Sequence, residues 1–67
     1  MNKKKISENL LKLRLKNKKT QKEVADAIGV AVSTYGMYEI GKRIPNDENK
    51  RKIASFFGTT VQAIFFN

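Results

Sequence analysis

Glycine divides this chain at regular intervals and limits it to short helical segments. Gly29, Gly41 and Gly58 each follow an apolar stretch, in the position that glycine often takes just beyond a helix C-terminus. The segments between them are about ten residues long, which suits one helix each. The 67 residues contain no Cys, so these segments must pack on one another without disulfides. The pattern predicts a single all-α domain, a compact five-helix bundle.

The first predicted helix covers residues 6–16. Ile6, Leu10 and Leu13 are spaced so that they share one helix face. Residues 11–16 also alternate between apolar and basic, as a half-buried strand would, but Leu, Lys, Arg and Glu are strong helix formers. We therefore predict a helix here, preceded by a flexible basic arm over residues 1–5, with the folded domain over residues 6–67.

The second predicted helix has the clearest start signal. Thr20 and Glu23 have the spacing of a capping box, in which each side chain accepts a hydrogen bond from the other residue's backbone N–H. Val24 and Ile28 supply an apolar face, and Gly29 ends the helix.

Three further helices complete the prediction. One begins near Val32 and ends near Ile40. Ala31, at its cap position, has no side-chain acceptor, so a start at Ser33 is the alternative. Asn46 caps the next helix, which Gly58 ends. Thr59 or Thr60 caps a short last helix.

Charge and composition narrow the functional classes. The formal charge is +8 and the sequence contains no His and no Cys. Such a charge suits a polyanion, although a solvated surface explains it equally well. The absence of His and Cys removes the commonest general base, nucleophile and metal ligands, so we predict no enzyme activity, no metal and no cofactor. Without an export signal or an apolar run of membrane-spanning length, the expected location is the cytoplasm.

Several short motifs in a fixed order resemble one known family. The segments at residues 20–25, 28–30 and 38–45 are similar to those of Cro/CI-type helix-turn-helix domains, also called the XRE family. The resemblance extends from about Ile6 to Phe65. It implies a lambda repressor-like fold with a helix-turn-helix at about residues 21–40, in a DNA-binding transcriptional regulator of bacterial or phage type, commonly a repressor and often a dimer.

The family's roles carry over to matching positions. The resemblance implies a buried ion pair between Arg14 and Glu39. The residues in the base-reading positions are Val32, Ser33, Thr34 and Met37. The residues in phosphate-binding positions are Gln21, Arg43, Asn46 and the hydroxyl of Tyr38, although the spacing of Tyr38 also fits core packing. For a homodimer on a near-palindromic DNA operator, the expected contacts are Phe66 and Ile64.

A second hypothesis keeps the fold and changes the function. The base-reading face lacks Gln, Arg and Asn, and it contains the apolar Val32 and Met37. Leu11, Leu15 and Phe66 fall outside the predicted core. These features favour a protein-interaction module of antitoxin or antirepressor type, with weak or no sequence-specific DNA binding. The charge and the positions of Gln21 and Arg43 argue for DNA.

Overall fold

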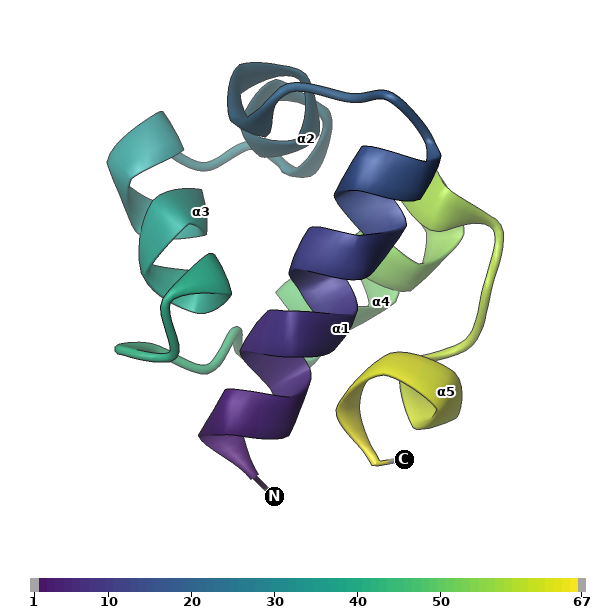
Figure 1. Cartoon of the computed structure of the whole chain (residues 1–67). Helices are drawn as coiled ribbons and strands as arrows, with labels where there is room; N and C mark the ends of the chain where they lie inside the picture. Colours follow the sequence, from purple (N-terminus) through teal and green to yellow (C-terminus); the bar gives the residue numbers. More distant parts are fainter. Residues whose placement is uncertain (1, 67) are drawn as a thin grey trace.

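Five helices make up the described part of the chain. The computed structural model describes residues 2–66 and contains no strand among them. The helices are α1 (Lys3–Lys16), α2 (Gln21–Ile28), α3 (Val32–Glu39), α4 (Asp47–Phe57) and α5 (Val61–Phe65). In Figure 1, α1 crosses the centre of the view, α2 and α3 lie at its upper and left sides, and α4 and α5 lie behind it and at its lower right. The predicted all-α five-helix fold is confirmed.

The first helix begins earlier than predicted. The Asn2 side chain caps α1 by accepting a hydrogen bond from the Lys5 backbone N–H at 3.2 Å. Lys3, Lys4 and Lys5 therefore form the first turn of the helix, and the prediction of a flexible arm is wrong for these three residues. Met1, which belongs to the same predicted arm, and Asn67 lie outside the residues that the structure describes.

The second helix follows its capping box. Thr20 Oγ1 accepts from the Glu23 N–H at 3.0 Å, and Glu23 Oε1 accepts from the Thr20 N–H at 2.9 Å. The hydrogen bond from the Thr20 backbone holds the pKa of Glu23 below its usual value. At the other end Gly29 adopts φ 76°, in the left-handed region that glycine tolerates best. Both ends of α2 are thus set by residues next to it in sequence.

The third helix starts without a side-chain cap. Ala31 occupies the N-cap position and makes no side-chain hydrogen bond, so α3 begins at Val32 and the later start at Ser33 does not occur. The helix ends at Glu39, with Ile40 as its C-cap. The C-terminal end has a local signal, because Gly41 adopts φ 77° and the Lys42 N–H donates to the Met37 carbonyl oxygen at 2.9 Å. The start has none, so packing must position the first turn of α3.

The last two helices are capped by single side chains. Asn46 accepts from the Asn49 N–H at 2.8 Å and starts α4. Thr60, rather than Thr59, caps α5 by accepting from the Ala63 N–H at 3.1 Å.

The core draws on all five helices. Ile6 and Leu10 of α1 face inward as predicted, whereas Leu11 and Leu15 are exposed. Ile64 is only 1% exposed. The prediction that Ile64 forms a dimer contact is therefore wrong, because its side chain is already enclosed within its own chain. The buried apolar residues are Ile6, Leu10, Val24, Ala25, Ile28, Tyr35, Tyr38, Ile53, Ala54, Ile64 and Phe65.

Within residues 2–66, none of the helices combines the length and the apolar character that a membrane crossing requires.

Candidate nucleic-acid interface

The third helix has a buried inner face and an exposed outer face. Tyr35 and Tyr38 point inward; they are 0% and 4% exposed, and their rings pack edge to face with centroids 6.1 Å apart. Val32 and Met37 lie on the outer face, at 40% and 37% exposure. An exposed side of a short helix with both polar and apolar side chains is the shape and chemistry that a DNA major groove can accept. Of the other two predicted base-reading residues, Ser33 is exposed and Thr34 is half-buried.

One carboxylate at the end of α3 anchors the helix to α1. Arg14 Nε donates to Glu39 Oε2 at 2.6 Å, and Arg14 Nη2 donates to Glu39 Oε1 at 3.1 Å. The two side chains are 15% and 4% exposed. Arg14 Nη1 also donates to the Lys19 carbonyl oxygen at 3.0 Å, so the same guanidinium secures the loop between α1 and α2. The ion pair that the sequence implied is present in the structure, with the planar two-bond geometry that favours Arg.

The same carboxylate also binds the first residue of α2. Gln21 Nε2 donates to Glu39 Oε1 at 3.0 Å. The hydrogen bond links the start of α2 to the end of α3 across 18 residues of sequence. The sequence placed Gln21 at a DNA phosphate but did not predict this bond, because only the folded arrangement brings the two residues together. Gln21 therefore has a fixed side-chain position at the edge of the outer surface of α3.

Burial and hydrogen bonding act against each other on the pKa of Glu39. Burial alone would raise this pKa, but the hydrogen bonds from Arg14 and Gln21, together with the nearby Tyr35 hydroxyl, outweigh it and hold the pKa below its usual value. Burial also raises the pKa of Tyr35 well above its usual value, and the Glu39 carboxylate adds to this effect. At neutral pH Glu39 is ionised and Tyr35 is not, so the anchor is a charged pair.

The loop after α3 turns sharply and exposes basic side chains. The backbone N–H groups of Lys42 and Arg43 both donate to the Met37 carbonyl oxygen, at 2.9 and 3.3 Å. These bonds hold the loop against the end of α3 while both side chains stay exposed. Asn46 uses its side-chain oxygen as the cap of α4, and its amide nitrogen is the group that could donate to a phosphate.

The four predicted phosphate-binding residues differ in access. Arg43 and Asn46 are exposed, Gln21 is half-buried, and Tyr38 is almost fully buried. Tyr38 therefore belongs first to the core, as the alternative interpretation of its spacing held.

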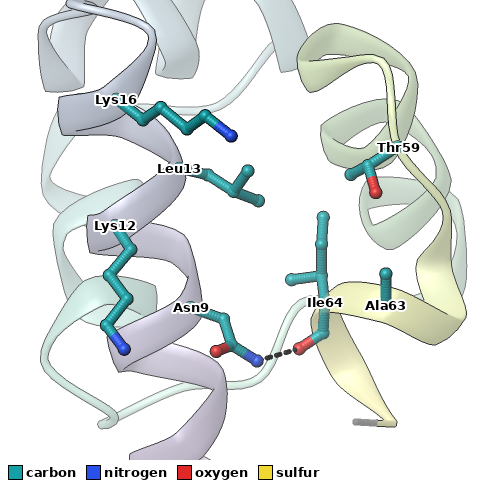
Figure 2. Close-up of a pocket in the computed structure, with 7 residues that line it drawn as sticks. All are labelled: Asn9, Lys12, Leu13, Lys16, Thr59, Ala63 and Ile64. Atoms are coloured by element: carbon teal, nitrogen blue, oxygen red, sulfur yellow. Dashed lines mark hydrogen bonds between the residues drawn. The ribbon is translucent and has the colours of Figure 1, made fainter.

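A separate cavity lies between α1 and α5, away from the outer face of α3. Figure 2 shows Leu13 and Ile64 at its centre, with Lys12 and Lys16 on the α1 side. Asn9 Nδ2 donates to the Ile64 carbonyl oxygen at 2.9 Å and closes its lower end in that view. No local sequence pattern predicts this bond, which ties the last helix to the first. The lining residues are Asn9, Lys12, Leu13, Lys16, Thr59, Ala63 and Ile64.

A buried lysine in α4, beside the end of α5, is a second feature that the sequence did not reveal. Lys50 is 7% exposed, and its Nζ lies 3.6 Å from Asp47 Oδ1. The same Nζ lies 5.8 and 5.5 Å from the ring centroids of Phe65 and Phe66. Aromatic faces attract a cation at such distances. The Phe66 ring is nevertheless 53% exposed and remains available at the surface.

Among residues 2–66, no group of three or more acidic side chains is arranged to hold a metal ion.

Comparison with known proteins identifies one matching family and two similar proteins among those found. The model of a helix-turn-helix family matches residues 10–64. The chain is 44% identical over 60 residues to the cryptic phage CTXphi transcriptional repressor RstR of Vibrio cholerae serotype O1, a match that covers 90% of this chain and 54% of that protein. A second protein of the same description from Vibrio cholerae is 38% identical over 56 residues, covering 84% of this chain and 50% of the relative. The chain thus spans about half the length of the curated relatives it matches. No solved structure gave a significant match.

Proposed function

The chain belongs to the Cro/CI-type (XRE) helix-turn-helix family, and we propose that it binds operator DNA as a transcriptional repressor of bacterial or phage type. The observation that carries this proposal is the exposed outer face of α3, bordered by Gln21 and by the Arg43 loop. Two relatives described as transcriptional repressors support it. The proposed activity is binding alone and needs no cofactor or catalytic group.

In this proposal the outer face of α3 reads base edges. Ser33 and Thr34 can hydrogen-bond to several bases, so they discriminate weakly. Val32 and Met37 cannot hydrogen-bond through their side chains, but they can pack on the thymine methyl group, the one apolar group in the major groove. We therefore expect half-sites with thymine opposite Val32 and Met37, and modest specificity.

Phosphate contacts then fix the position of α3. Gln21 is held by Glu39, and the second hydrogen of its amide nitrogen remains for a phosphate oxygen. Arg43 is exposed on the loop after α3, where its backbone N–H binds the Met37 carbonyl oxygen. Its positive charge attracts the phosphates. Asn46 and the Tyr38 hydroxyl are secondary contacts, since the first is committed to a cap and the second is nearly buried.

A homodimer would place two copies of α3 one DNA turn apart on a near-palindromic operator, about 34 Å from centre to centre. Phe66, at 53% exposure, is the apolar residue at the end of α5 that favours an interface there. Sedimentation of the protein with Phe66→Ser tests this: we expect the dimer fraction to fall relative to the unchanged protein. An unchanged dimer fraction would move the interface elsewhere, and a monomeric parent protein would reject the dimer.

The function itself is tested by gel shift with two DNA fragments. The first carries the promoter region next to the protein's own gene, and the second is a random sequence of equal length. We expect tighter binding to the promoter fragment, with affinity for both falling as salt rises. Equal affinity for both fragments would contradict sequence-specific repression, and no binding to either would contradict the DNA proposal.

Thymine recognition has its own test on the bound operator. Uracil in place of the thymines opposite Val32 and Met37 removes only the methyl groups. The wild-type affinity should fall by about 1 kcal/mol per site. Val32→Ala should be insensitive to the replacement at its own position, and equal wild-type binding of both operators would mean that these side chains do not read thymine.

A protein-interaction module remains the second candidate function, on one specific observation. Leu11, Leu15, Ile40 and Phe66 are large apolar side chains exposed at 39%, 61%, 66% and 53%. Such side chains are common at protein interfaces when they lie together. Failure of the gel shift, combined with capture of a defined partner that Leu15→Ser abolishes, would favour this candidate.

A further inference from the structure

The start of α1 lies beside the loop that follows α3. A methyl group added at Gly41 would lie 3.5 Å from the Lys3 carbonyl oxygen and 3.8 Å from Ser7 Oγ. In Figure 1 the same loop passes next to the N-terminal end of α1. The segment that carries Lys42 and Arg43 is therefore adjacent in space to the first turn of α1, although it is far away in sequence.

Helix periodicity assigns Lys3 and Lys5 to different sides of α1. Lys3, Ser7 and Arg14 follow one stripe, since they are four and then seven residues apart. Ser7 contacts the Gly41 position and Arg14 binds Glu39, so this stripe faces α3 and the loop after it. Within this stripe, Lys3 lies at the N-terminal end of α1, beside the loop after α3.

Lys5 lies on the opposite side of the helix. It shares its stripe with Asn9, Lys12 and Lys16 by the spacing of four, seven and eleven residues. Those three residues line the cavity against α5. Lys3 and Lys5 are thus two exposed lysines of the same helical turn that face opposite neighbours, which provides a matched pair for experiment.

Among residues 2–66, no acidic side chain pairs with the basic side chains beside the loop after α3. Lys3, Lys42 and Arg43 are all exposed. None of the ion pairs found among residues 2–66 includes any of them. Three neighbouring cations without a carboxylate repel one another and create a local positive potential, which a polyanion relieves. Because Lys3 belongs to α1 and not to a flexible arm, its position relative to the loop is fixed.

We propose that Lys3, Lys42 and Arg43 form one phosphate-binding surface, in which the first turn of α1 adds a contact to the DNA backbone beyond those of α2 and the loop. This inference rests on the proposed DNA-binding function and specifies its partner atoms. The surface binds phosphate oxygens without reading sequence, so it increases affinity for every DNA duplex equally. Lys5 takes no part in it.

The experiment compares Lys3→Gln with Lys5→Gln in the full chain. Both remove one positive charge from the same turn. Binding to a mixed-sequence DNA duplex is measured over a series of salt concentrations, and circular dichroism verifies that both variants keep their helix content. For Lys3→Gln the slope of log affinity against log salt should become shallower by about 0.9, the value for one lost phosphate contact. Between roughly 50 and 200 mM salt this change amounts to about a threefold difference in affinity. Lys5→Gln should keep the wild-type slope, and Lys3→Arg should restore it.

The outcomes separate this inference from the proposed function. A wild-type slope near zero would contradict DNA binding itself. A steep wild-type slope that Lys3→Gln leaves unchanged would overturn only the role of Lys3. Equal changes for Lys3→Gln and Lys5→Gln would also overturn it, because the effect would then depend on net charge and not on the surface beside the loop.

Discussion

The two helices of the helix-turn-helix are equal in length but differ in what holds them. Both α2 and α3 have eight residues. Helix α2 has a complete capping box at its start and the left-handed Gly29 at its end. Helix α3 has Ala31 at its N-cap, no side-chain cap, and Gly36 in its interior. Local sequence therefore specifies both ends of α2, but it specifies only the C-terminal end of α3, where Gly41 adopts φ 77°.

The difference shows how α3 is held in place although its start has no side-chain cap. Helix α3 is held from its inner side, by the buried rings of Tyr35 and Tyr38 and by the bonds of Glu39 to Arg14 and Gln21. None of these contacts involves the outer face. Residues such as Val32 and Met37 can therefore serve recognition without affecting the fold.

The largest expected effect comes from breaking the anchor of α3. Glu39→Ala leaves the Arg14 guanidinium, 15% exposed, without its carboxylate, and loss of one partner of a buried pair costs about 3–5 kcal/mol. For a domain of this size that is a large part of the total stability. Urea unfolding measures the loss.

The control for this prediction is an exposed ion pair on α2. Lys22 and Asp26 are 73% and 61% exposed and lie 2.9 Å apart. Lys22→Ala should cost only about 0.3–0.5 kcal/mol. A similar small loss for Glu39→Ala would mean that the pair does not anchor α3.

Acid should weaken the same anchor. The pKa of Glu39 is lower in the folded chain than its usual value of 4.5, so the folded state favours the ionised form. This stability is present above pH 4.5 and is lost as the pH falls through the lower folded-state pKa. We expect the unfolding free energy to fall with pH in this window, and to fall less in Glu39→Gln. Equal pH profiles for the two proteins would contradict the role of this carboxylate.

The caps should show the contrast between the two helices directly. Thr20→Ala removes the N-cap hydroxyl of α2 and should cost about 1 kcal/mol. Ala31→Ser adds a hydroxyl at the uncapped start of α3, where the backbone already has the extended conformation of an N-cap, φ −66° and ψ 150°. It should gain about 0.5 kcal/mol or more. Thermal unfolding of both variants should give shifts of opposite sign, whereas a loss with Ala31→Ser would show that α3 tolerates no cap.

A further small effect concerns the glycine inside α3. Gly36→Ala should stabilise the helix by roughly 0.5–1 kcal/mol, because alanine has less backbone freedom to lose. The nearest atom to the added methyl group is Gln21 Oε1 at 3.8 Å, an ordinary van der Waals distance. Urea unfolding should therefore show a gain, and a loss would indicate that Gln21 needs this space.

Sequence predicted the parts of this protein that depend on neighbours along the chain. The capping box at Thr20, the cap at Asn46 and the inward face of α2 follow from local patterns, whereas the sequence left the cap of α5 open between Thr59 and Thr60. The sequence does not predict the start of α1, because Lys3, Lys4 and Lys5 show no apolar periodicity and Asn2 alone is a weak cap signal.

What the sequence could not predict depends on distant contacts. The Gln21–Glu39 bond, the Asn9–Ile64 bond and the closeness of Lys3 to Gly41 all join separate elements. Ile64 was misassigned because a helix of only five residues is too short for periodicity to separate its buried side from its exposed side.

The central claim is that DNA lies against the outer face of α3. Its most direct test is the change in backbone amide NMR signals when a promoter DNA duplex is added to isotope-labelled protein. We predict the largest changes at Val32, Ser33, Met37, Gln21 and Arg43, and little change at the cavity residues Thr59 and Ala63. Large changes confined to α5 and the cavity, with the α3 signals unmoved, would contradict the account.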